Sequence, residues 1–199
     1  MASTLLWLVR HATHTRLASV LCGRMADVGL DEAGHAQAAR LADRLMRESP
    51  RALYASPQRR ACETAEVVAL RCGLPAAVAP DIDEIDFGDW TGLTFATLHD
   101  DPLWQRWNDA RATVRPPRGE SMAEAQDRVL RWAWCLRARH PGGTVVAVSH
   151  ADVIKAALAG ILGLSLDCHA RFEIAPASIS AVALWEGGAK VLQVNETVA

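Results

Sequence analysis

The sequence predicts an α/β fold with a mainly parallel central sheet and helices on both faces. Two continuous apolar runs, residues 5–9 and 144–149, are typical of strands that are buried on both faces of a parallel sheet. Helical patterns alternate with such strands along the chain, as in α/β proteins. The 199 residues, half of them hydrophobic, are consistent with one globular domain over residues 1–199.

The first part of the chain predicts a loop, two helices and a short strand. Apolar residues in the segment 13–30 follow neither the helical nor the strand periodicity, which predicts a loop over the end of the first strand. A helix is expected from Asp31, where apolar residues begin to recur at helical spacing. After a short strand at 51–55, Ser56 supplies a predicted N-cap and Pro57 the first helical position, so the next helix is expected to begin at Pro57.

The second part begins with an excursion from the sheet. In residues 80–120, an acidic stretch that is interrupted by glycines is followed by a stretch of mixed polar and apolar composition. This pattern predicts a partly helical segment beside the active site. Ser121 and Glu124 predict a capping box that opens a further helix. A short helix is expected to follow the second apolar run. The tail alternates, and three strands are expected there, at residues 171–175, 178–185 and 190–194.

Charge and composition exclude several classes of protein. The formal net charge of −2 gives no basic footprint, so nucleic acid is not an expected partner. No apolar run reaches the roughly 18 residues of a membrane span, and the start lacks a secretory pattern, so a cytoplasmic protein is expected. The five cysteines are widely spaced without a CxxC pair, which indicates neither a disulfide framework nor a zinc site.

Three predicted strands are followed by residues that bind anions. Arg10 and His11 follow the first strand, Arg59 and Arg60 stand in the helical turn after the strand at 51–55, and His150 follows the second apolar run. Because the ligand crevice of a parallel sheet lies beyond the carboxyl ends of its strands, we expect these side chains to converge. Guanidinium groups and helix amino ends attract phosphate, and imidazole is a nucleophile near neutral pH. The strand ends therefore predict a cationic pocket of phosphate size.

Phosphoryl transfer from an ester also needs a proton source for the leaving group. Four carboxylates in the excursion are candidates: Asp83, Glu84, Asp86 and Asp89. By its composition alone, this stretch is more typical of a solvated acidic loop. Two histidines with a carboxylate-rich segment also permit a second class of enzyme, a metal-dependent hydrolase.

Five segments of the chain occur in an order that is typical of one family. They are LVRHA, SPQRRACETA, DEIDFGDWTGLT, GESMAEAQDRV and VVAVSHADVI, within residues 5–154. In these segments the chain resembles the histidine phosphatase superfamily, the phosphoglycerate-mutase-like phosphatases. Each motif is modest by itself, and together they are specific.

The resemblance implies a role for each residue that matches a motif. His11, Glu84 and His150 would be catalytic: His11 would take the phosphoryl group as a phosphohistidine, and Glu84 would protonate the leaving alkoxide and then activate water. Arg10, Arg60 and His150 would bind the transferring phosphate. The implied reaction is hydrolysis of a small phosphorylated metabolite, with no metal and no cofactor.

The chain departs from the family's pattern around the first motif. Ala12 replaces a glycine, and Thr13 and Leu17 stand where many members carry glutamate and asparagine. The outer phosphate contacts could therefore be remade by Thr13, His14 or Arg16.

Two alternatives remain beside the phosphatase. One is a phosphoglycerate mutase, which needs extra cationic groups and a closed pocket, whereas the basic residues of the excursion are interleaved with aspartate and tryptophan. The other is a non-catalytic member of the fold that only binds a phosphorylated ligand. The sequence leaves open the physiological substrate and whether the protein forms a homodimer.

Overall fold

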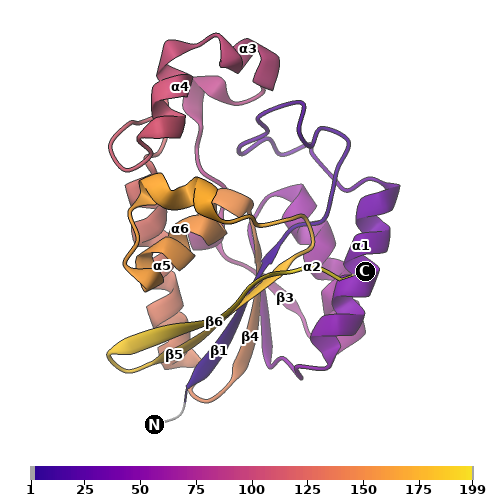
Figure 1. Cartoon of the computed structure of the whole chain (residues 1–199). Coiled ribbons are helices and arrows are strands. Elements are labelled where there is room, and N and C mark those ends of the chain that lie inside the picture. Colours follow the sequence, from indigo (N-terminus) through magenta and orange to yellow (C-terminus); the bar gives the residue numbers. More distant parts are fainter. Residues whose placement is uncertain (1–2, 199) are drawn as a thin grey trace.

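A six-stranded sheet forms the centre of the molecule (Figure 1). The computed structural model describes residues 3–198. The strands are β1 (Thr4–Arg10), β2 (Ala52–Ala55), β3 (Ala76–Val78), β4 (Thr144–Ser149), β5 (Ile179–Trp185) and β6 (Gly188–Glu196), in the order β3-β2-β4-β1-β5-β6. β1 to β4 are parallel, and β5 and β6 are antiparallel to their neighbours. The prediction of a mainly parallel sheet is confirmed.

Helices cover both faces of this sheet, as predicted (Figure 1). They are α1 (Glu32–Met46), α2 (Arg59–Cys72), α3 (Phe95–His99), α4 (Pro102–Asp109), α5 (Met122–Arg139) and α6 (Ala151–Leu162), with short 3-10 helices at Pro80–Ile82, Gly88–Trp90 and Leu166–Arg171. α1 and α2 lie on one face, and α5 and α6 lie on the other.

β1 shows why the first apolar run forms a central strand. Successive side chains of a strand point to opposite faces of the sheet. Trp7 and Val9 therefore pack against α1 and α2, whereas Leu6 and Leu8 pack in the core beneath α5 and α6. Each large apolar side chain that is fully buried contributes about 1.5–3 kcal/mol, so both faces hold the strand in place.

The capping residues place two helices where the sequence predicts them. The Asp31 side chain accepts a hydrogen bond from the Gly34 amide at 2.7 Å, and α1 begins at the next residue after Asp31. Ser121 and Glu124 form the predicted capping box of α5. Each of these contacts satisfies backbone N–H groups that the helix leaves without a partner.

Two local predictions are wrong. α2 begins at Arg59 and not at Pro57, and its N-cap is Gln58 and not Ser56. The Ser56 hydroxyl accepts from the Gln58 amide at 3.3 Å, but it also binds Asp83 and His150. Residues 171–175 do not form a strand. Both edges of β1 are already paired, with β4 and β5, so this segment cannot join that strand. Arg171 ends a 3-10 helix, and the Ile174 carbonyl accepts from Arg10 at 2.6 Å.

The excursion at 80–120 is partly helical, as predicted, and an aromatic cluster holds it together. The ring centroids of Trp90 and Trp107 each lie 5.3 Å from that of Trp104, and the Phe87 centroid lies 5.5 Å from that of Trp107. A Cβ atom on Gly88 would stand 2.1 Å from the Pro117 carbonyl oxygen, so only glycine allows the two ends of the excursion to meet. The excursion is therefore a packed layer whose Phe87 and Phe95 reach the candidate site.

Candidate active site

Two parallel strands end side by side and bring two histidines together. Arg10 of β1 is in register with Ser149 of β4, so the residues that follow them, His11 and His150, are neighbours. Their ring centroids lie 5.2 Å apart. The predicted convergence at this edge of the sheet is found in the structure, and it follows from the register of the two strands.

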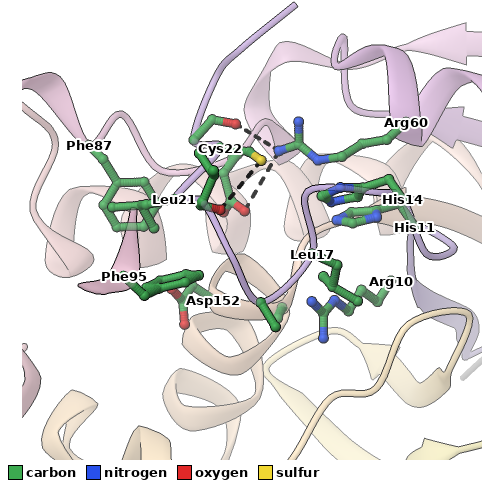
Figure 2. A pocket seen from close by; sticks show the side chains of 15 residues that line it. Arg10, His11, His14, Leu17, Leu21, Cys22, Arg60, Phe87, Phe95 and Asp152 are labelled. Atoms are coloured by element: carbon green, nitrogen blue, oxygen red, sulfur yellow. Dashed lines mark hydrogen bonds and ion pairs between the residues drawn. The ribbon is translucent and has the colours of Figure 1, made fainter. Parts of the chain in front are cut away.

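A pocket of about 400 Å³ opens at this edge. Figure 2 shows Arg10, His11, His14 and Arg60 on one side of it, and Phe87 and Phe95 on the other. The remaining lining residues are Leu17, Ala18, Val20, Leu21, Cys22, Gly23, Glu84, Ala151 and Asp152. A pocket of this size holds a phosphate group together with an organic group.

The His11 imidazole is held in one tautomer. Its Nδ1 atom lies 2.8 Å from the Ala12 carbonyl oxygen, which can only accept a hydrogen bond, so Nδ1 carries the proton and Nε2 has a free lone pair. Burial lowers the pKa of His11 well below its usual value, and the charges of Arg60 and Arg10 lower this pKa further. The ring is therefore neutral at physiological pH, which is the nucleophilic form.

The segment around His11 is fixed by contacts with α1 and α2. The Ala12 amide donates to the Thr64 hydroxyl at 3.0 Å, and the Thr13 amide donates to the Gln37 side chain at 2.9 Å. A Cβ atom on Gly34 would stand 2.1 Å from the Thr13 carbonyl oxygen, so the helix packs directly on this turn. The imidazole is therefore held on a rigid turn, which favours a defined direction of attack.

Arg10 and Arg60 keep part of their hydrogen-bonding capacity unused within residues 3–198. Arg60 donates from Nη2 to the Gly23 carbonyl oxygen at 2.7 Å, but its buried Nη1 has no partner there. The buried Nε of Arg10 likewise has none, and its Nη1 donates to Ile174. A buried donor without a partner costs about 1–3 kcal/mol, so both guanidinium groups are prepared for an anion.

His150 is oriented by a chain of two hydrogen bonds. The Ser56 hydroxyl lies 3.0 Å from Asp83 Oδ1 and 2.7 Å from His150 Nε2. Because the carboxylate accepts the serine proton, the serine oxygen accepts from His150, and Nε2 carries the ring proton. Nδ1 accepts a hydrogen bond from Arg60 Nη2 at 3.3 Å, and His150 itself is fully buried behind the residues that line the pocket. Burial lowers the pKa of His150 well below its usual value, and the charge of Arg60 lowers this pKa further.

Of the four candidate carboxylates, Glu84 lines the pocket. Its Oε2 atom lies 3.6 Å from His150 Nδ1 and 3.9 Å from Arg60 Nη2. Burial, and after it the charge of Asp152, raises the pKa of Glu84 to about 7. A carboxyl group that stays protonated near neutral pH can serve as a general acid.

The other three carboxylates have structural partners. Asp83 binds Ser56 and Gln58, Asp86 accepts from the Gly88 amide, and Asp89 pairs with Arg118.

The residues that could remake the outer phosphate contacts are not equivalent. His14 lines the pocket with its ring centroid 5.4 Å from that of His11, and burial lowers its pKa to about 4. Arg16 pairs instead with Asp27 at 3.3 Å. Arg59, the neighbour of Arg60, pairs with Glu63 at 2.6 Å and does not line the pocket.

The sequence analysis misses Asp152 and the aromatic wall of Phe87 and Phe95. Asp152 stands in the first turn after a strand-end histidine, which is a recognisable position, but its direction depends on how α6 packs. Phe87 and Phe95 are apolar residues of the excursion, and in the sequence nothing separates a pocket wall from a core residue.

His11 and His14 stand in HxxH spacing, which also occurs in metal sites. Within residues 3–198, no group of three or more histidine, cysteine, aspartate or glutamate side chains could hold a metal ion. The same residues include no helix that is long and apolar enough to cross a membrane.

The fold and the site together define a class: an α/β protein with a buried imidazole pair, two arginines and a carboxyl group around an anion pocket. The family model of the histidine phosphatase superfamily (branch 1) matches residues 6–197. The chain belongs to this superfamily, as the sequence motifs indicate.

Relatives of the chain include phosphatases and a mutase. A phosphoserine phosphatase of Hydrogenobacter thermophilus is 32% identical over 175 residues, which are 87% of this chain and 83% of that protein. A probable phosphoglycerate mutase of Proteus mirabilis is 29% identical over 179 residues, which are 88% and 83% of the two chains.

A solved structure and a longer relative complete the comparison. The structure of mycobacterial glucosyl-3-phosphoglycerate phosphatase with VO3 has a TM-score of 0.88 and 27% identity, and the match covers 97% of this chain and 99% of that chain. A bifunctional protein of Mycobacterium tuberculosis is 35% identical over 177 residues. The match covers 85% of this chain but only 47% of that protein, so the chain spans about half of its length.

Proposed function

We propose that the protein is a phosphatase that hydrolyses a small phosphomonoester through a phosphohistidine on His11. The observation that carries this proposal is the His11 tautomer, because the bond from Nδ1 to Ala12 leaves Nε2 free to attack phosphorus. The relatives named as phosphatases support the same reaction class.

In the first step, Nε2 of His11 attacks the phosphorus atom and the bond from phosphorus to the ester oxygen breaks. Arg10 and Arg60 bind the oxygens of the transferring group, His150 orients Arg60 by accepting a hydrogen bond from it, and Glu84 gives its proton to the leaving alkoxide. In the second step, Glu84 takes a proton from water, the resulting hydroxide attacks phosphorus, and the bond from nitrogen to phosphorus breaks. The second step returns His11 and protonated Glu84 and releases inorganic phosphate.

The charge around the pocket favours hydrolysis over a mutase reaction. A mutase has to hold a second phosphate with further cationic groups. In the excursion, Arg111, Arg115 and Arg118 are each engaged in an ion pair, with Asp152, Glu124 and Asp89.

The choice between the two reactions is tested by supplying 3-phosphoglycerate with catalytic 2,3-bisphosphoglycerate and, separately, p-nitrophenyl phosphate. We expect release of phosphate to be faster than isomer formation. If isomer formation is faster than hydrolysis, the protein is a mutase. If neither ester releases phosphate, the result favours the non-catalytic binding protein.

We also propose that turnover needs no metal ion. Arg10 and Arg60 carry the positive charge that stabilises the transferring phosphoryl group. Activity on p-nitrophenyl phosphate is therefore expected to stay within about twofold after incubation with excess EDTA and buffer exchange. A loss that added divalent ions restore would show that a metal takes part.

A further inference from the structure

The pocket has a second compartment beyond the phosphate end, and its wall is apolar. Leu17, Leu21, Phe87 and Phe95 line it, and the two phenylalanines lie opposite the arginines in Figure 2. Phe95 also packs against Trp104, with 6.2 Å between the ring centroids, which anchors the wall in the excursion. Once the phosphate lies between the arginines, the organic part of the ester meets this wall.

The second compartment holds no cation among the described residues that line the pocket. Arg10 and Arg60 are the arginines of the lining and both lie at the phosphate end, and no lysine lines the pocket. Glu84 and Asp152 are the acidic residues of the lining, and Glu84 lies at the phosphate end, 3.9 Å from Arg60 Nη2. A carboxylate on the organic part would therefore be desolvated against apolar groups and repelled by Asp152.

Arg111 stands behind Asp152 and does not reach the pocket. It donates to Asp152 Oδ1 and to Asn108 Oδ1, both at 2.9 Å, and its guanidinium lies 3.7 Å from the centre of the Trp107 ring. The Arg111 side chain is 8% exposed, whereas that of Asp152 is 23% exposed. The pair therefore presents its carboxylate, not its cation, to the substrate.

Two further arginines near the pocket rim are also engaged. Arg16 pairs with Asp27, and Arg24 pairs with Asp83 and with Glu120 at 3.1 Å. Neither guanidinium lines the pocket, and the charge of each is already balanced by a neighbouring carboxylate.

We infer that the site selects phosphomonoesters whose organic part is apolar or carries an ammonium or hydroxyl group, and that Asp152 disfavours a carboxylate there. This inference rests on the proposed function, because it takes the phosphate end from that proposal. Phosphoserine and glucosyl-3-phosphoglycerate each carry a carboxylate, so the expected substrates differ in charge from the compounds in the relatives' names.

Three phosphonates of similar length test the selection: butylphosphonate, 3-aminopropylphosphonate and 3-phosphonopropionate. Each is measured as an inhibitor of p-nitrophenyl phosphate hydrolysis and by calorimetric titration. We expect the first two to bind about tenfold tighter than 3-phosphonopropionate, since one repulsive charge at short range is worth about that factor. The variant Asp152→Asn, which keeps an acceptor for Arg111, is expected to reduce this ratio to about threefold or less.

Asp127→Asn is the matched control, because Asp127 is exposed on α5 and does not line the pocket. This control should leave the ratio of the dissociation constants of 3-phosphonopropionate and the other two phosphonates unchanged. Equal or tighter binding of 3-phosphonopropionate, or a ratio that Asp152→Asn does not change, would overturn the inference. Absence of p-nitrophenyl phosphate hydrolysis would overturn the proposed function instead, and the calorimetric ratio would still test the charge selection.

Discussion

Replacing His11 with alanine is expected to lower phosphate release by about 10⁴-fold or more. No other imidazole occupies the position of the His11 ring, because the ring centroids of His14 and His150 lie 5.4 and 5.2 Å from it and Nε2 of His150 is bonded to Ser56. Loss of the nucleophile of a covalent mechanism commonly costs 10⁴–10⁶-fold. The measurement is kcat/KM for p-nitrophenyl phosphate.

His35→Ala is the control for this substitution, because His35 is exposed on α1. It should retain wild-type kcat/KM, and circular dichroism should show that both variants are folded. A His11→Ala variant that keeps more than about a tenth of the activity would contradict covalent catalysis by this residue.

Replacing Glu84 with glutamine is expected to lower kcat/KM by about 10²–10⁴-fold for alkyl phosphates, whose leaving groups need a proton. The loss should be much smaller for p-nitrophenyl phosphate, because p-nitrophenolate leaves without protonation. Glu66→Gln is the matched control, since Glu66 is exposed on α2. Equal losses on both kinds of substrate would contradict the role of a general acid.

The pH dependence follows from the same carboxyl group. The first step needs protonated Glu84, and its pKa is raised to about 7. kcat/KM for an alkyl phosphate should therefore be flat below pH 7 and fall about tenfold per pH unit above it. His11 is neutral on both sides of this range because its pKa is lowered. In Glu84→Gln the fall above pH 7 should disappear, while the effects of substrate ionisation remain.

The sequence predicts the parts of the site that lie on strand ends. The apolar runs of β1 and β4 locate His11 and His150, since parallel strands in register end at the same edge. The resemblance distinguishes Arg60 from Arg59 and Glu84 from the neighbouring carboxylates, a choice that residue spacing leaves open.

The remaining features depend on contacts between distant segments. Ser56 has the pattern of an N-cap, but Asp83 and His150 compete for its hydroxyl from 27 and 94 residues away. The direction of Asp152 likewise depends on Arg111, which belongs to the excursion. Local propensity describes neither case, because the partners meet only in the folded chain.

Trapping of the enzyme-bound phosphate on the Glu84→Gln variant tests the central claim most directly. With p-nitrophenyl phosphate, this variant should still undergo the first step but activate water slowly, so the intermediate should accumulate. After a quench in alkali, labelled substrate is expected to leave one phosphoryl group on His11, in step with a burst of p-nitrophenol. Release of p-nitrophenol with all of the label in inorganic phosphate at the earliest times would contradict the phosphohistidine mechanism.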